Sequence, residues 1–408
     1  MEPSDASVPS EPGAPSNRVA GDDRLLTPLF VLLIAAGLCY FLSIASLLPT
    51  LPLYIEEELG GGGLEVGLVV GAFAVSAALI RPTVGRYGDV VGRRWMALAG
   101  AGLAAVAIVP LGIVPAIWFL VVLRLVAGLG EACFFIGAAT AAQDLAPDHR
   151  RGEAASLFSV AIYTGLAFGP TVGEWIYKSS GPTATWLFAG GSAAVAFVLS
   201  WFIPAAMGRV ENPAPRRGLL HPAAIQPGWV LLLGIMGFTG FAAFLPLYVD
   251  EIGVDEAGPF FLVYGIIVLA VRVVGARVPD RQGPVRTSSF ALVAIAAGIG
   301  AVALFASPAG VWVGTVLLAI GMSFLFPALF TLAVNGAPVE ERSHAVGTFS
   351  LFFDLSQGLG APALGLAVTA FGTERAAFVL GALIAVVGLV IANTRLRAAV
   401  PAVSAAVR

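Results

Sequence analysis

Long apolar segments recur along almost the whole chain. Each holds about 20 residues or more between glycines, prolines or charged residues, which is the length that an α-helix needs to cross the hydrocarbon core of a bilayer. Hydrophobic residues make up 58% of the chain and charged residues 12%, whereas soluble domains carry roughly 25% charged residues. We therefore predict an all-α polytopic membrane protein with twelve transmembrane helices. The helices are expected at residues 28–54, 65–85, 94–115, 116–142, 154–177, 183–204, 228–249, 258–278, 287–306, 309–335, 343–370 and 375–394.

Cysteine and histidine are too few and too scattered for a metal centre. Cys39 and Cys133 both lie inside apolar segments, and His149, His221 and His344 fall in predicted loops or, for His344, at the loop end of a predicted span, without ligand spacing. The sequence contains no Walker-type phosphate-binding loop, and the predicted spans contain no histidine that could act as a catalytic base. We expect no metal, no cofactor and no enzymatic activity. A formal net charge of −3 gives no support for a nucleic-acid partner.

Basic residues collect on one side of the predicted membrane. With the N-terminus in the cytoplasm, all but four of the 22 basic residues fall on the inner side. Lys178 and Arg375 fall outside, and Arg124 and Arg272 lie within spans, while the outer loops are acidic. Because basic residues are retained in the cytoplasm, we expect a multi-pass protein of the cell (plasma or inner) membrane with both termini cytoplasmic.

A shift of 191 positions aligns the two halves of the chain. It pairs Arg81 with Arg272 and Asp89 with Asp280, which chance matching of apolar helices would not do. Two pseudo-symmetric six-helix bundles of the same orientation are therefore predicted. Arg81 and Arg272 are interpreted as charges at the inner surface, with Arg272 reaching the cytoplasmic interface. The expected division is a disordered cytoplasmic tail at 1–27, an N-terminal bundle at 28–206, a cytoplasmic linker at 207–227, a C-terminal bundle at 228–396 and a cytoplasmic tail at 397–408.

The segment GRYGDVVGRR, from Gly85 to Arg94, follows the second predicted span. It resembles the signature that the major facilitator superfamily carries between its second and third helices, although Val90 stands where the family usually has a basic residue. The resemblance implies that Asp89 is a gate residue on the cytoplasmic face, and the alternative is a plain orienting charge. The matching residues are Gly85, Asp89, Gly92, Arg93 and Arg94, and the counterparts in the second half are Asp280 and Arg281.

Three charged residues that have no counterpart in the repeat lie deep in predicted spans. Arg124 and Glu131 are seven residues apart and share one helical face, about 12 Å and about 22 Å from the outer boundary, while Asp354 lies near the midplane. An unpaired charge at such a depth costs about 2.5–3.5 kcal/mol, so these residues are expected to face a cavity or a partner. The segment around Arg124 resembles a motif of the superfamily, and the arginine of that motif is linked to proton coupling. A structural ion pair is the alternative for Glu131 and Asp354.

The segment GLAFGPTVGE in the fifth predicted span resembles the motif of the superfamily's antiporters, at Gly165, Gly169, Pro170 and Gly173. Small residues permit close helix contact, and a proline inside a helix provides a hinge. Generic helix packing is the alternative. Glu174 replaces the motif's last glycine and is expected at the outer water interface.

The sequence therefore predicts a secondary active transporter that moves a small organic molecule by alternating access. The resemblance favours the twelve-helix drug/proton antiporter-like branch, with efflux in exchange for protons. Uptake by proton symport and a non-transporting receptor or scaffold of the same fold are the alternatives. Apolar and aromatic residues dominate the predicted cavity, which suggests an uncharged or amphipathic cargo. The expected partners are this small molecule, protons and the lipid bilayer, with the chain as a monomer.

Overall fold

The structure, a computed structural model, describes residues 25–147, 151–205, 220–274, 282–337 and 342–396. Within these ranges, the side chains of residues 82, 85–90, 151–153, 155, 156, 272–274 and 342–344 are left undescribed. All regular elements in the described ranges are helical, and ten of the helices are long and apolar enough to cross a membrane. The helical membrane architecture expected from the apolar segments is thus confirmed.

The helices agree closely with the predicted apolar segments. α5 contains 50 residues and breaks at Gly181, whose φ of 81° is a left-handed conformation that glycine adopts without strain. The segments predicted at 154–177 and 183–204 are therefore its two arms. α6 begins inside the predicted linker. The bounds are α1 Pro28–Glu57, α2 Gly63–Val91, α3 Arg93–Ile108, η1 Val109–Gly112, α4 Ile117–Asp144, α5 Arg151–Ser200, α6 Pro222–Glu251, α7 Gly258–Val274, α9 Pro284–Leu304, α10 Pro308–Asn335, α11 Arg342–Phe371, α12 Arg375–Ile391 and η4 Ala392–Leu396.

Local sequence explains where several helices begin. α1, α6 and α10 each start with a proline, whose fixed φ suits the first helical turn and whose missing N–H would have no partner there. Thr27 and Ser307 stand directly before two of these prolines, and their hydroxyl oxygens accept hydrogen bonds from the amides of Phe30 and Gly310, both at 3.3 Å.

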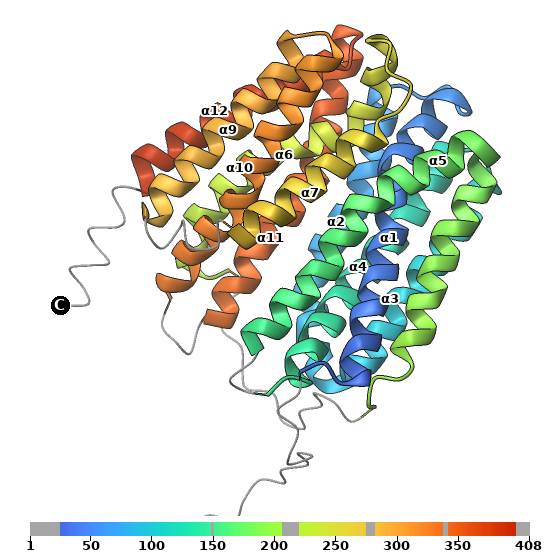
Figure 1. The fold of residues 1–408 in the computed structure, drawn as a ribbon, viewed down its shortest axis with the longest axis vertical. Helices are drawn as coiled ribbons and strands as arrows, with labels where there is room; N and C mark the ends of the chain where they lie inside the picture. Colours follow the sequence, from blue (N-terminus) through green and yellow to red (C-terminus); the bar gives the residue numbers. More distant parts are fainter. Residues whose placement is uncertain (1–24, 148–150, 206–219, 275–281, 338–341, 397–408) are drawn as a thin grey trace, which may run out of the picture.

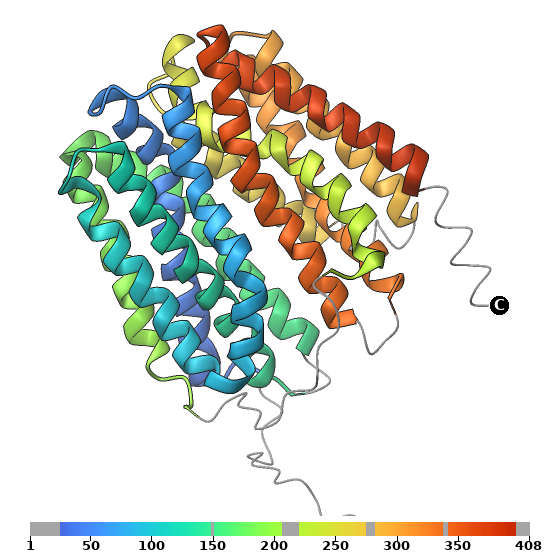
Figure 2. The same cartoon turned by 180° about the vertical axis from the view of Figure 1, so that it is seen from behind.

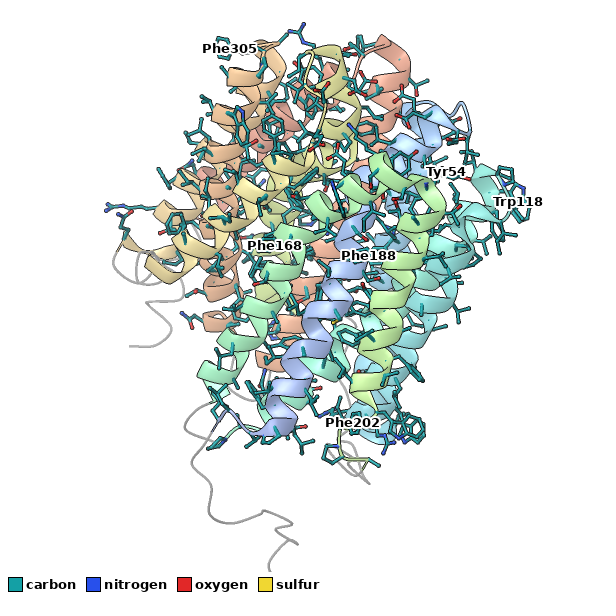
Figure 3. The ribbon with its side chains drawn as sticks, turned by 45° about the vertical axis from the view of Figure 1, so that its right-hand side comes forward. Tyr54, Trp118, Phe168, Phe188, Phe202 and Phe305 are labelled. Carbon is teal, nitrogen blue, oxygen red and sulfur yellow. The ribbon has the colours of Figure 1, made fainter. Side chains whose placement is uncertain are left out.

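Large apolar side chains cover the outside of the molecule. Exposed aromatic residues include Trp118 and Phe305 near one end and Phe202 near the other (Figure 3), with exposures of 65%, 63% and 54%. Aromatic rings at both ends of apolar helices are typical of the two interfaces of a bilayer.

The two ends of the molecule differ in charge. We call the end that carries Glu57, Glu251 and Glu374 the acidic end, and the end that carries Arg93 and Arg395 the basic end. The N-terminal helices α1–α5 lie on one side and α6–α12 on the other (Figure 1), and the view from behind shows the same grouping (Figure 2). The ribbons of α2 and α11 run together near the acidic end and diverge toward the basic end.

The two groups of helices meet in what we call the seam, the contact of α2 with α11 and of α5 with α7 near the acidic end. A Cβ atom added to Gly67 would lie 2.4 Å from the carbonyl oxygen of Ala361, and one added to Gly71 would lie 2.8 Å from that of Gly358. Such distances leave no room for a side chain, so glycine allows the two backbones to touch. The Leu64 amide also donates to the Thr369 hydroxyl at 3.1 Å.

Candidate functional site

Three charged side chains from three helices meet between the two groups of helices. The Arg81 Nη2 on α2 donates to the Glu131 Oε2 on α4 at 2.8 Å and to the Asp354 Oδ1 on α11 at 3.1 Å. The Arg81 Nε lies 2.7 Å from the Asp354 Oδ2. We call Arg81, Glu131 and Asp354 the triad. It joins residues that are 273 positions apart in the chain.

The triad is largely shielded from solvent. Its side chains are 15%, 13% and 6% exposed for Arg81, Glu131 and Asp354. The Arg81 guanidinium also lies 5.4 Å from the ring centre of Phe135, one turn beyond Glu131, in a cation–π contact. With all three groups ionised the triad carries one excess negative charge, because a single guanidinium serves two carboxylates. A proton can therefore be accommodated on a carboxyl here without loss of the other pair.

Two of the three predicted charged residues are brought together, and the third is not. Glu131 and Asp354 share Arg81, whereas Arg124 lies apart. Arg124 is 6% exposed, and its Nε and Nη1 have no hydrogen-bonding partner among the described residues. Its guanidinium lies 4.3 Å from the ring centre of Phe73 on α2. A cation–π contact of this kind stabilises the charge by up to about 2 kcal/mol, which is less than the cost of an unpaired charge at the centre of a span.

The placement of Arg81 corrects the sequence prediction. An inner-surface charge was expected, but the side chain lies inside the protein between two carboxylates. The reason is that α2 continues to Val91, ten residues beyond Arg81. The sequence does hold a signal for this placement. Arg81 stands inside the span predicted at 65–85, and a charge inside a span is expected to face a partner. The side chain of its repeat counterpart, Arg272, lies outside the description.

The predicted gate motif is described only in part. The side chains of Gly85 and Asp89 lie outside the description, as do Asp280 and Arg281 altogether. Gly92 precedes α3 with a φ of 95°, a conformation that favours glycine. The Arg93 Nε lies 3.2 Å from the Asp144 Oδ2 at the end of α4. The Arg94 guanidinium lies 4.5 Å from the ring centre of Trp201.

The predicted antiporter motif packs α5 against α1. A Cβ atom added to Gly165, Gly169 or Gly173 would lie 2.8, 2.6 or 2.4 Å from atoms of α1. All three glycines thus permit close contact between two helices of the same group. Pro170 is buried within the helix. The hinge role of Pro170 stays a prediction.

Glu174 occupies a different place from the one expected. It is 1% exposed, so it does not lie in water. Its Oε1 accepts a hydrogen bond from the Ala257 amide at 2.9 Å and its Oε2 accepts one from the Gly258 amide, both at the start of α7. The Thr171 hydroxyl donates to the Gly258 carbonyl oxygen at 2.9 Å, and the Lys178 Nζ lies 3.4 Å from Glu174. This polar contact is the α5–α7 part of the seam.

The comparisons with known proteins agree with this architecture. Residues 33–361 match the sequence profile of the Major Facilitator Superfamily. This chain belongs to that superfamily. Within the described residues no three His, Cys, Asp or Glu side chains lie together as metal ligands would.

Several members of the superfamily are similar to this chain over most of its length. An uncharacterized MFS-type transporter of Salmonella typhimurium strain LT2, STM4428, is 30% identical over 375 residues, covering 89% of this chain and 95% of the relative. The uncharacterized MFS-type transporter YhhS of Escherichia coli K12 is 26% identical, covering 81% and 83%. The crystal structure of the peptide transporter POT in complex with sulfate has a TM-score of 0.76 at 15% identity, covering 92% and 94%. The protein is therefore a multi-pass membrane transporter of the major facilitator fold.

Proposed function

We infer that the chain is a proton-coupled secondary transporter in which the triad holds the coupling proton. The observation that carries this inference is the ion pair between Arg81 and Asp354, because it links the two groups of helices that alternating access must move apart. A protonated Asp354 has no charge to offer Arg81, so proton binding weakens this link. Deprotonation restores it, and the two groups of helices approach again.

The proposed topology has twelve spans in two six-helix bundles, with the two arms of α5 counted separately. The acidic end faces outward and the basic end faces the cytoplasm, in the cell membrane, as the distribution of basic residues favours. In this orientation the seam closes the outer side. The chain is then in its inward-facing state, with both termini in the cytoplasm.

Two directions of transport follow from different observations. Export in exchange for protons is favoured by the resemblance to antiporters at Gly165, Gly169, Pro170 and Gly173. Uptake together with protons is favoured by Arg124, because its buried Nε and Nη1 have no hydrogen-bonding partner among the described residues and attract an anion. The cargo is a small organic molecule in either case. The proposed role of Asp89 and Asp280 in a cytoplasmic gate is common to both.

Asp354→Asn tests the proposed role of the triad. Purified protein is reconstituted in liposomes that contain a pH-sensitive dye, and small acids, amines, sugars and amino acids are added one at a time. We expect the parent protein to move protons with one class of compound. The variant should lose uphill, pH-driven transport and keep exchange of the same compound across the membrane, because only the titrating group is removed.

Asp144→Asn is the matched control, since it removes a carboxylate that pairs with Arg93 at the basic end, outside the triad. It should keep uphill, pH-driven transport, and only the rate is expected to differ, because Arg93 belongs to the predicted gate motif. Unchanged concentrative transport in Asp354→Asn would refute the proposed proton site. Absence of flux for every compound that binds would instead favour the receptor or scaffold.

A further inference from the structure

Two buried polar groups are left unused by the proposed proton site. The Nε and Nη1 of Arg124 and the Oη of Tyr40 have no hydrogen-bonding partner in the described part of the chain, although Arg124 is 6% and Tyr40 0% exposed. Arg124 on α4 and Tyr40 on α1 are close enough in space for the guanidinium and the phenol to interact electrostatically. Buried donors are nearly always satisfied in folded proteins, so these groups call for an acceptor that the described residues do not supply.

The surroundings of these groups are aromatic. The Arg124 guanidinium lies over the ring of Phe73. The Tyr40 ring stacks on Phe134 at a centroid distance of 3.9 Å and meets the edge of Phe41 at 5.5 Å. Such rings keep water away from the two donors, and the partly exposed ring of Phe73 offers a flat apolar contact to the body of a ligand.

The charges of the region favour an anion that arrives with a proton. Arg81 and Arg124 balance Glu131 and Asp354 when all four are ionised. A proton on Asp354 leaves one excess positive charge, which sits on the unpaired Arg124. An anion bound at Arg124 would restore neutrality, and moving a neutral set of charges through a low-dielectric interior is less costly than moving a charged one.

We propose that Arg124 and Tyr40 bind the carboxylate of an organic acid whose apolar body packs among the aromatic side chains of α1, α2 and α4. A guanidinium offers two parallel N–H donors that match a carboxylate, and the phenol of Tyr40 adds a third donor. This assignment rests on the proposed function and deepens it. Cargo and proton travel in the same direction, and among the kinds of cargo expected from the sequence the amphipathic one is favoured, as an acid.

The first test needs no ligand. Arg124→Met replaces the unpaired charge by an apolar side chain of similar length, so the empty protein should become more stable, with a melting temperature higher by about 2 °C or more. Arg375→Met is the matched control, because Arg375 donates two hydrogen bonds to the Ala303 carbonyl oxygen at 3.0 and 2.8 Å. That control should melt at a lower temperature than the parent. A lower melting temperature for Arg124→Met as well would show that Arg124 is structural and overturn the proposal.

The second test uses 3-phenylpropionate with its matched alcohol and amine, 3-phenylpropanol and 3-phenylpropylamine. The acid should raise the melting temperature of the parent protein, and the two matched compounds should not. Arg124→Met should weaken binding of the acid at least about tenfold, which is the effect of about 1.4 kcal/mol, and Tyr40→Phe should weaken it severalfold. Arg124→Lys should bind the acid more tightly than Arg124→Met does, because it keeps the positive charge but lacks the two parallel N–H donors of a guanidinium.

Three results of the second test would overturn the acid site. They are equal stabilisation by the alcohol, undiminished binding in Arg124→Met, and no stabilisation by any straight-chain or phenyl-substituted acid of two to ten carbons. A different result would refute the proposed proton site. In that case the acid would bind, and the Asp354→Asn variant would still transport it uphill.

Discussion

The seam and the triad both join the two groups of helices, but they are built from different chemistry. In the seam, backbones touch at Gly67 and Gly71, and a carboxylate accepts from fixed backbone amides at the start of α7. In the triad, three side chains meet through two ion pairs that share one guanidinium. The glycine contact has the same strength whether or not a proton is bound, whereas the triad changes with each proton that binds to a carboxylate. We therefore propose that the glycine contact of the seam closes the acidic end and that the triad couples this closure to protons.

The largest expected effect is that of Arg81→Gln. It leaves Glu131 and Asp354 without their shared cation, and breaking a buried ion pair from one side costs about 3–5 kcal/mol. Thermal unfolding of the purified protein in detergent measures this loss. The double variant with Asp354→Asn should regain a large part of it, because one uncompensated carboxylate is gone.

Asp144→Asn is again the control for Arg81→Gln. It breaks the Arg93–Asp144 pair, in which the Asp144 side chain is 33% exposed, and partly exposed pairs contribute about 0–1 kcal/mol. Equal losses of stability in the two variants would show that the buried ion pairs of the triad contribute no more than the partly exposed pair.

A smaller effect is expected for Gly67→Ala in the seam. The added methyl group would lie 2.4 Å from the Ala361 carbonyl oxygen, and overpacking of this kind costs about 1–3 kcal/mol. The two backbones should move apart, so that a cysteine introduced at Val368, which is 5% exposed and packs against Gly63, becomes accessible to a membrane-impermeant thiol reagent in a background without Cys39 and Cys133.

Gly191→Ala is the matched control, because nothing lies within 4 Å of the position of its Cβ. It should be neutral or stabilise its helix by about 0.5–1 kcal/mol. If Gly67→Ala leaves labelling at the acidic end unchanged, the seam is not what closes that end.

The smallest of the three effects belongs to Glu174→Gln. The glutamine amide keeps the shape of the side chain and one acceptor oxygen, but its NH2 group opposes one of the two amides of α7, at a cost of about 1–3 kcal/mol. The variant should raise thiol labelling near the acidic end less than Gly67→Ala does. A larger increase would mean that the α5–α7 contact, and not the glycine contact, dominates the seam.

Sequence reasoning located the helices and two of the three members of the triad, and it failed where a charged residue was taken as the end of a span. Glu131 and Asp354 stand out because each is an acid inside an apolar segment. Arg81 and Glu174 were placed at the water interfaces, yet α2 continues to Val91 and α5 continues across Gly181. Membrane helices extend beyond the hydrocarbon core, so a charge near the predicted end can still lie inside the protein.

The pairing of side chains lay beyond the sequence for a second reason. Arg81 meets Asp354 only because α2 and α11 are neighbours in space, and no local pattern encodes that neighbourhood. The contacts of Gly67 and Gly71 are equally hidden, because a glycine in an apolar segment has the same appearance whether it faces lipid or another backbone. Among the described residues, the lack of a hydrogen-bonding partner for the Arg124 Nε and Nη1 is likewise visible only once the neighbouring helices are in place.

The separation of the seam from Arg124 has a consequence for how such a protein can diversify. The seam glycines Gly67 and Gly71 on α2 are different residues from those of the proposed acid site, whose two donors lie on α1 and α4 and whose Phe73 lies on α2. A substitution at Arg124 or Tyr40 can then change which compound is carried while the machinery of opening and closing stays intact. We expect descendants of one such chain to exchange cargo through a few substitutions on α1 and α4, each of them tolerated by the fold.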